Sequence, residues 1–334
     1  MTEKNVVTTT TENTNMIIDD FDKLNGKIGK DWDDLPKNEP PVSEHNPLRL
    51  GIVGHGFVGK AVEYAFTHPL VKIKTVDPKY GTTVDNILDF DAHLTFVCAP
   101  TPMHENGVVD STIVEDAVLK LMHHTNTTVV IKSTVTPDVI DRLYNSMTES
   151  SFDRMVYNPE FLQEVSSKKD FVDAKFHVLG GSDIATEHLM QAYDMFSLCS
   201  SNEYYKMSAH EASFVKYGIN AYLATKVTFF NQFYDLVNAY KCSYNIITRA
   251  MGKDDRVGIG HTRVPGFDGK KGFGGACLPK DTTAFLKFSE AQKENGDMVC
   301  FDLLKEVLNI NNRYRKNYDL DDREKVNNIK FGDE

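Results

Sequence analysis

Short apolar runs alternate with longer amphipathic stretches from Leu48 onward. The apolar runs predict six strands, at residues 50–53, 71–76, 94–98, 128–131, 155–157 and 176–179. The intervals between the first four are long enough for crossover helices. This alternation is typical of a parallel, doubly wound sheet with helices on its faces. We therefore expect an α/β domain over residues 48–205.

The pattern changes after Lys206, where the strand signals disappear. Residues from about 208 to 240 carry apolar positions at helical spacing, with no proline among them, which predicts one long helix. A shorter helix is expected over 243–251, a glycine-rich loop over 258–276, and further helices from about Asp281 and Met298. Residues 206–312 are thus predicted to form a second domain that is all α.

Both ends of the chain are polar. Residues 1–47 are rich in Thr, Asn, Asp and Lys and end in several prolines, which is typical of a disordered acidic tail. A patch of helical spacing lies within it, at Ile17, Ile18, Phe21 and Leu24. It favours either a docking segment or a solvated tail. We expect residues 313–334 to form a frayed C-terminal tail.

Composition excludes several classes of protein. The 334 residues include 37 Lys and Arg against 48 Asp and Glu, a net charge of −11. No basic surface is therefore predicted for nucleic acid. No apolar stretch approaches the roughly 20 residues of a membrane span, and the N-terminus has no apolar signal region. We expect a soluble, cytoplasmic protein without a membrane partner.

The five cysteines are too scattered for a disulfide framework, and they include no CxxC pair that would indicate a zinc site. We therefore expect reduced thiols and no bound metal. One of these thiols is then free to react.

A glycine motif follows the first predicted strand and precedes a predicted helix. It reads Gly54-His55-Gly56-Phe57-Val58-Gly59. In this context GxGxxG indicates a Rossmann-type dinucleotide site, with the pyrophosphate on the helix N-terminus. Asp77 ends the second strand, where its carboxylate favours the ribose hydroxyls of NAD over the 2′-phosphate of NADP. Lys79 is a weak signal against that choice, and an FAD site or a turn that binds nothing stays open.

The segment from Gly272 to Asp281 is the most unusual in the chain. Its glycines allow the backbone to wrap closely around a ligand, and it places Cys277 just before Lys280 and Asp281. A nearby cation, or a helix starting at Asp281, is expected to lower the pKa of the thiol and make it nucleophilic. Taken alone, Cys277 is equally well interpreted as a small buried apolar residue.

Together these segments resemble the UDP-glucose/GDP-mannose dehydrogenase family, whose members oxidise the alcohol of a nucleotide sugar to a carboxylate. The resemblance extends from about residue 49 to 310. Besides the glycine motif with Asp77 and the Cys277 loop, it rests on Ala99-Pro100-Thr101-Pro102 with Gly107 and Asp110, Lys132-Ser133-Thr134-Val135, Asn158-Pro159-Glu160-Phe161-Leu162 with Glu164, Glu211 with Lys216 and Asn220, and Arg256-Val257-Gly258. Several motifs in the right order make the resemblance specific.

The resemblance implies a reaction in two hydride transfers to NAD, with UDP-glucose as the expected substrate and UDP-glucuronate as the expected product. It implies that Cys277 captures the intermediate aldehyde as a thiohemiacetal and then forms a thioester. Lys216 and Asn220 are four residues apart, so on a helix both face the developing oxyanion. Asp281 then orients a water or Lys216. Glu160 is the family's usual general base, although the roles of Glu160 and Glu164 stay open.

Further site residues follow from the resemblance only. Thr134 is expected to position the hydrolytic water. Cofactor contacts are expected from the glycine motif, Asp77, Pro100, Thr101, Thr134, Glu164 and Lys280. Substrate contacts are expected from Phe161, Leu162, Glu164, Lys216, Asn220, Phe273 and Arg256, the last reaching from a neighbouring subunit. The long helix resembles the family's dimer core, so we expect a homodimer.

The chain departs from the family pattern after the helical region. Full-length members carry a third, UDP-binding domain there, which residues 311–334 are too short to replace. We expect either weak binding of the nucleotide sugar, a separate chain that supplies the missing domain, or a relative without turnover. UDP-N-acetylmannosamine and GDP-mannose are alternative substrates. A single-step hydroxyacid dehydrogenase and a non-catalytic, NAD-binding regulatory module are the alternative functions.

Overall fold

The computed structural model describes residues 42–43, 46–294 and 297–332. The apolar patch at residues 17–24 and nearly all of the predicted acidic tail lie outside the described residues. The chain divides into two compact units. Of the described residues, the smaller unit holds 42–43, 46–48 and 68–72, and within it the Leu48 N–H donates to the Leu70 carbonyl (2.8 Å). The helices and strands lie in the larger unit, except that Leu48, Val71 and Lys72, with which two strands begin, are assigned to the smaller unit.

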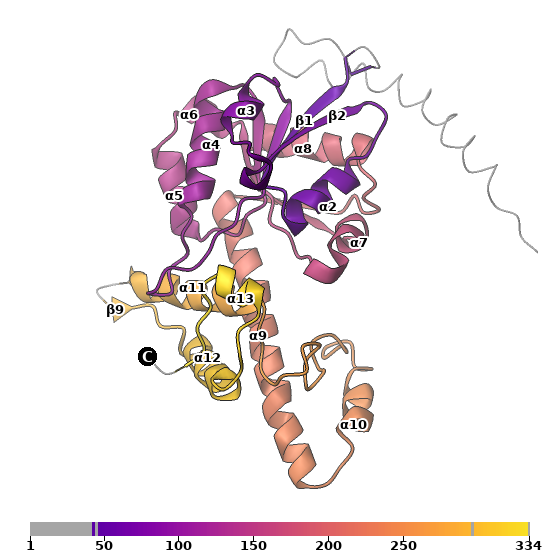
Figure 1. Ribbon diagram of the computed structural model, residues 1–334, viewed down its shortest axis with the longest axis vertical. Coiled ribbons are helices and arrows are strands. Elements are labelled where there is room, and N and C mark those ends of the chain that lie inside the picture. Colours follow the sequence, from indigo (N-terminus) through magenta and orange to yellow (C-terminus); the bar gives the residue numbers. More distant parts are fainter. Residues whose placement is uncertain (1–41, 44–45, 295–296, 333–334) are drawn as a thin grey trace, which may run out of the picture. The chain divides into compact units, whose positions relative to one another are not determined.

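A seven-stranded sheet forms the first half of the fold, in the order β2-β1-β3-β4-β5-β6-β7 (Figure 1). Its strands are β1 (Leu48–Val53), β2 (Val71–Val76), β3 (Leu94–Val97), β4 (Thr128–Ile131), β5 (Met155–Tyr157), β6 (His177–Gly181) and β7 (Tyr204–Met207). The pairs β1–β3, β3–β4 and β4–β5 are parallel. The residues of β3 and β4 are all buried, which explains why continuous apolar runs in the sequence predicted these strands.

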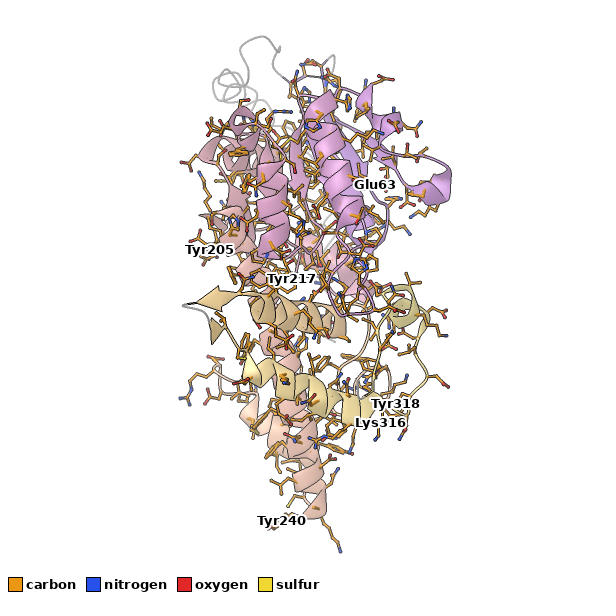
Figure 2. All side chains as sticks on the ribbon, turned by 90° about the vertical axis from the view of Figure 1, so that its left-hand side faces the viewer. Glu63, Tyr205, Tyr217, Tyr240, Lys316 and Tyr318 are labelled. Carbon is orange, nitrogen blue, oxygen red and sulfur yellow. The ribbon has the colours of Figure 1, made fainter. Side chains whose placement is uncertain are left out.

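The sheet departs from the prediction in two places. The sixth strand is antiparallel to β5, so the sheet is mixed rather than wholly parallel. A seventh strand, β7, then pairs with β6 in parallel. Its central Tyr205 and Lys206 are exposed at the sheet edge, and Figure 2 marks Tyr205 there. A half-exposed edge strand carries no apolar run, so the sequence pattern missed it.

Helices on the faces of the sheet complete this Rossmann-type half. They are α2 (Phe57–Ala65), α3 (Asp85–Leu88), α4 (Thr112–His124), α5 (Pro137–Asn145), α6 (Glu149–Phe152), α7 (Ser167–Val172) and α8 (Asp183–Phe196), with 3-10 turns at Pro78–Tyr80 and Glu164–Ser166. Helix α4 turns Val114, Val118 and Leu121 into one core shared with Ile140 and Leu143 of α5. Burial of these apolar faces fixes the helices against the strand ends that carry the site.

A single helix of 31 residues, α9 (Ala209–Ala239), extends from the sheet into the second half (Figure 1). Ser208 and Glu211 begin it with a capping box, in which each side chain accepts the other residue's backbone N–H. A side chain at Gly180 of β6 would meet the Cα of Ala209 at 2.7 Å, so the first turn of α9 packs directly on the sheet. In Figure 2 Tyr240 marks its far end.

The remaining helices follow α9. They are α10 (Tyr244–Met251), α11 (Leu278–Ala291), α12 (Asp302–Arg315) and α13 (Asp322–Val326), with a hairpin of β8 (Lys293–Glu294) and β9 (Asp297–Met298) after α11. Tyr217 of α9 is fully buried and stacks on Phe285 of α11, with ring centroids 5.4 Å apart. The prediction of a helical second half with one long helix is therefore confirmed, and the β8–β9 hairpin is a departure from the all-α expectation. No described helix is long and apolar enough to cross a membrane.

The predicted frayed tail is wrong for most of its length. The chain forms α13 there, Glu324 is 2% exposed and Ile329 is 1% exposed. The segment looked polar because its few inward-facing residues, one of them a carboxylate, are separated by exposed charges. Helix α11 also begins at Leu278 rather than Asp281, with Pro279 in its first turn.

Candidate active site

The three glycines of the Gly54–Gly59 turn serve three different purposes. Gly54 has φ +90°, and a Cβ there would lie 2.7 Å from the carbonyl oxygen of Cys98. A Cβ at Gly59 would lie 2.1 Å from the Gly54 oxygen, so this glycine allows helix and strand to touch. Gly56, at the N-cap of α2, has no atom within 4 Å of its Cβ position. That open space at a helix N-terminus is where a pyrophosphate fits.

The carboxylate of Asp77 is held in place beside this turn. Its Oδ2 accepts the His55 N–H (2.6 Å) and its Oδ1 accepts the Lys79 N–H (2.9 Å). Burial alone would raise the pKa of Asp77, but these hydrogen bonds and the Lys79 charge lower it overall. The Lys79 ammonium lies 3.5 Å from Oδ2. The acid is thus ionised and oriented at the end of β2.

His55 points its ring away from the open side of the turn. The ring contacts the Tyr80 hydroxyl through Nδ1 (2.7 Å) and Glu63 through Nε2 (2.8 Å). Figure 2 marks Glu63 on α2. The side chain therefore braces the turn, and only the backbone N–H of His55 meets Asp77.

One cavity of about 720 Å³ runs from the glycine turn to the cysteine loop. This volume is ordinary for a cofactor site. Predicted site residues that line it are Gly54, Gly56, Phe57, Val58, Asp77, Pro100, Thr101, Thr134, Glu160, Cys277, Lys280 and Asp281. The turn and Cys277 are more than 200 positions apart in the sequence, and only the packing of α11 beneath the sheet brings them to one space.

Lys216 and Glu160 form a buried ion pair beside the cavity. The Lys216 ammonium donates to the Glu160 carbonyl (2.6 Å) and lies 3.2 Å from its carboxylate. It also lies 5.5 Å above the Phe161 ring. Burial alone would lower the pKa of Lys216, but the charges of Glu160 and Asp281 raise it overall. Lys216 is therefore a fixed cation.

A second buried group centres on Asp281. Its Oδ2 accepts the Asn220 amide N–H (2.6 Å), and its Oδ1 accepts the Lys280 ammonium (2.6 Å). Lys280 also donates to the Thr101 hydroxyl (3.3 Å). Lys216 and Asn220 thus lie one turn apart on α9, as predicted, but each is held by a different acid.

The expectation that Cys277 has a lowered pKa is wrong. Burial, together with the charges of Asp281 and Glu160, raises the pKa of the thiol to about 11. Lys216 and Lys280 act in the opposite direction, but each is already paired with one of these carboxylates. At neutral pH the free chain therefore holds Cys277 as a protonated thiol at the start of α11.

Four predicted residues lie away from this group. Glu164 is exposed and pairs with Arg323 (3.2 Å), and Arg256 is exposed and pairs with Asp254 (2.6 Å). Phe273 is buried in a cluster with Ala224 and Val307. The last, Leu162, lines with Phe161 a second cavity of about 180 Å³ that shares Glu160 and Lys132 with the first.

Sequence reasoning gave no role to Lys132, which lines both cavities. Its ammonium donates to the Asn158 amide oxygen (3.0 Å) and lies 5.0 Å above the Phe171 ring. Burial lowers its pKa to about 8. The sequence did offer one indication of a role for Lys132, because it belongs to the Lys132–Val135 segment on which the family resemblance rests. The residues of α12 and α13 that hold the glycine-rich loop could not be recognised from any motif in the sequence.

The comparisons with known proteins agree with this arrangement. Residues 80–197 match the NAD binding domain of the UDP-glucose/GDP-mannose dehydrogenase family, and residues 210–313 match the central domain of the same family. The chain belongs to this family. Its Rossmann-type half is accordingly the family's NAD-binding domain.

Individual relatives carry the same family name. A UDP-glucose 6-dehydrogenase of Haloferax volcanii is 30% identical over 73% of this chain and 66% of its own length. One of Rickettsia felis is 29% identical over 72% of this chain and 52% of its own. The solved UDP-glucose dehydrogenase of Pyrobaculum islandicum is 26% identical, with a TM-score of 0.66 over 83% of this chain and 70% of that one. The chain spans about half the length of several curated relatives that it matches.

Proposed function

We propose that the protein is an NAD-dependent nucleotide-sugar dehydrogenase that oxidises C6 of UDP-glucose to the carboxylate of UDP-glucuronate. The observation that carries the proposal is the single cavity that joins the Gly54–Gly59 turn to Cys277. A dehydrogenase that removes four electrons needs both features in one space, because hydride must leave a carbon that is bonded to sulfur. The names of the relatives support this choice of substrate.

The turn fits NAD by its own geometry. The open face of Gly56 at the N-terminus of α2 suits the pyrophosphate, and the Asp77 carboxylate suits the adenosine ribose hydroxyls. When bound, NAD supplies the hydride acceptor. Thr101 and Thr134 line the part of the cavity between this turn and Cys277.

In the first oxidation the sugar alcohol gives its hydroxyl proton to water and a hydride from C6 to the acceptor, which gives the aldehyde. Lys216 is a fixed ammonium, so its role is to stabilise negative charge on the substrate oxygen. Asn220 anchors Asp281 and thereby aligns the first turn of α11, which begins just after Cys277. No proton transfer by Asn220 is required.

In the second oxidation the Cys277 thiol adds across the aldehyde C=O, so that sulfur bonds to carbon and the thiol proton passes to the oxygen, which forms the thiohemiacetal. Loss of the hydroxyl proton to water and of a second hydride from that carbon, to a second molecule of the acceptor, gives a thioester. Water then attacks the thioester, the carbon–sulfur bond breaks, and acid and thiol are released. Glu160 is the base for this water, with Thr134 beside it on the cavity wall. Because the pKa of Cys277 is raised, proton removal must accompany its attack.

We further propose a homodimer formed through α9. This helix exposes large apolar side chains along its length, at Phe214, Tyr222, Phe229 and Leu236, and Tyr240 follows its last residue. Such a face is typical of a helix that is buried by a partner. Arg256 is exposed on the loop after α10, where it pairs with Asp254, and we propose that it exchanges this partner for a neighbouring subunit's site.

The test is NADH formation at 340 nm with NAD and a panel of UDP-glucose, UDP-N-acetylmannosamine and GDP-mannose. We expect two NADH per UDP-glucose consumed. A preference for another sugar would change the substrate but leave the mechanism intact. NAD binding without turnover on any sugar would refute the proposal and favour a regulatory role or a required partner chain.

Replacement of Cys277 by Ser separates one-step from two-step chemistry. We expect the variant to stop releasing acid, because an alkoxide ester does not form or hydrolyse as a thioester does. Exposed Cys242 serves as the matched control, and its Ser variant should behave as the parent protein. Continued acid release by the Cys277 variant would favour a hydroxyacid-type dehydrogenase.

A further inference from the structure

The loop that leads to Cys277 is held by side chains from other helices. The Gly272 N–H donates to Asn231 of α9 (2.9 Å), and the Phe273 N–H donates to Asn311 of α12 (2.7 Å). The Asn311 amide donates in return to the Phe273 carbonyl (3.0 Å). This first part of the loop is therefore fixed by helices of the central domain.

The second part, nearest Cys277, is held by a different segment. The Gly275 N–H donates to Oε1 of Glu324 in α13 (2.9 Å). Arg315, at the end of α12, donates to the Gly272 carbonyl (3.1 Å), and its Nη1 lies 3.8 Å from the same Glu324 oxygen. Both charged side chains are 2% exposed. A Cβ at Gly274 would lie 2.3 Å from Arg315, so the loop is pressed against this pair.

Glu324 is itself rigidly placed. Its other oxygen, Oε2, accepts the Asp321 N–H (2.9 Å), and the Asp321 side chain accepts the Glu324 N–H (2.8 Å). This capping box fixes the carboxylate at the start of α13. One carboxylate thus joins the helix start to the backbone two residues before Cys277.

The same segment also contacts the NAD-binding domain. The Asn327 carbonyl accepts the Met103 N–H (3.3 Å), and the Asn328 amide donates to the Met103 carbonyl (2.9 Å). Arg323 pairs with Glu164 (3.2 Å). Asn327 lines the cavity that also contains the glycine turn. Residues 321–329 therefore touch loops that follow β3 and β5 as well as the cysteine loop, and α13 is drawn in yellow in Figure 1.

We propose that residues 321–329 form a strap that positions Cys277, with Glu324 as the positioning residue and Arg315 as its support. The match to the family's central domain ends at residue 313, so the strap lies beyond it. The inference rests on the proposed role of Cys277 as nucleophile. The strap holds the half-buried thiol at the cavity wall, and its release would leave the thiol more accessible but misplaced.

The test compares Glu324→Ala with Glu324→Gln and with Asp322→Asn, whose fully exposed carboxylate lies in the same strap. Two rates are measured for each, namely alkylation of Cys277 by iodoacetamide, read by mass spectrometry, and kcat with UDP-glucose. For Glu324→Ala we expect alkylation at least fivefold faster and kcat at least tenfold lower, with the Kd for NAD within twofold. Gln keeps an acceptor for the Gly275 N–H, so it should restore both rates to within threefold. Asp322→Asn should match the parent protein.

If Glu324 served stability alone, its replacement would lower the melting temperature. At temperatures below that melting point, the alkylation rate and kcat would then not change in opposite directions. Equal alkylation rates in Glu324→Ala and the parent protein would therefore overturn the proposal. If the alanine variant does not fold, Glu324→Asp keeps the charge but is too short for both contacts, and it is judged by the same rates. The alkylation result stands even if the parent protein oxidises no nucleotide sugar, so a failure of the proposed function is recognised separately.

Discussion

The glycine turn allows a sharp test, because a methyl group added at Gly59 would clash with the backbone whereas one added at Gly56 would not. Alanine at position 59 would place its Cβ 2.1 Å from the Gly54 oxygen, where ordinary contact begins at 3.4 Å. Backbone must therefore shift by about 1.3 Å, which is the difference between these distances. Alanine at position 56 meets no atom within 4 Å, and its backbone is not strained.

The expected energies follow from these distances. Overpacking costs about 1–3 kcal/mol, and a clash with backbone rather than with a flexible side chain belongs at the upper end. The higher helix propensity of Ala offsets about 1 kcal/mol at Gly59. A net loss of about 2 kcal/mol lowers Tm by roughly 4–8 °C for a domain of this size. Gly56→Ala adds no clash, so it should lower the free energy of unfolding by only about 0.5–1 kcal/mol, because Ala is a poorer N-cap than Gly.

For NAD binding we expect the opposite ranking, with the larger effect in Gly56→Ala. The methyl group of Gly56→Ala occupies the space proposed for the pyrophosphate, so the Kd for NAD should rise at least tenfold, or about 1.4 kcal/mol. The assays are thermal unfolding by circular dichroism and NAD titration by calorimetry, on both variants and the parent protein. An unchanged Tm for Gly59→Ala would refute the close packing of helix and strand. An unchanged Kd for Gly56→Ala would refute the placement of the cofactor.

Three further predictions concern charge. Since the pKa of Cys277 is raised to about 11, its alkylation rate should rise about tenfold per pH unit from 7 to 10, and a plateau near pH 8 would contradict this. Burial lowers the pKa of Lys132 to about 8, so above that pH this side chain binds more protons in the unfolded protein than in the folded one. The free energy of unfolding should therefore rise with pH between about 8 and 10, by up to about 3 kcal/mol relative to the Lys132→Met variant. Chemical denaturation of both proteins across this range checks the difference, and parallel curves would refute it. Asp77→Asn should raise the Kd for NAD about tenfold and weaken the preference for NAD over NADP, measured by calorimetry with both cofactors.

Local patterns in the sequence determined most of the fold. Buried parallel strands are continuous apolar runs, so the sequence predicted β1, β3, β4 and β5 close to their positions in the structure. The 31 residues of α9 were legible because helical periodicity runs unbroken from its capping box. The glycine turn was equally legible, because its strand, its helix and Asp77 are neighbours in the chain.

Tertiary structure decided what depends on distant groups. The pKa of Cys277 rises because packing removes the thiol from most of its water and brings it near the charges of Asp281 and Glu160, whose partner lysines are already paired. Sequence proximity to Lys280 suggested the opposite sign. The direction of β6 depends on its antiparallel pairing with β5, which an apolar run does not encode, and β7 is a half-exposed edge strand with no apolar run to detect.

The C-terminal segment makes the same distinction most clearly. By sequence it is a polar tail, because a carboxylate such as Glu324 gives no sign of burial. Only the folded chain brings Arg315 and the Gly275 N–H to that carboxylate, and these partners offset the cost of removing it from water. The sequence determined which residues carry charge and which carry apolar surface, and the tertiary structure decided which charges meet.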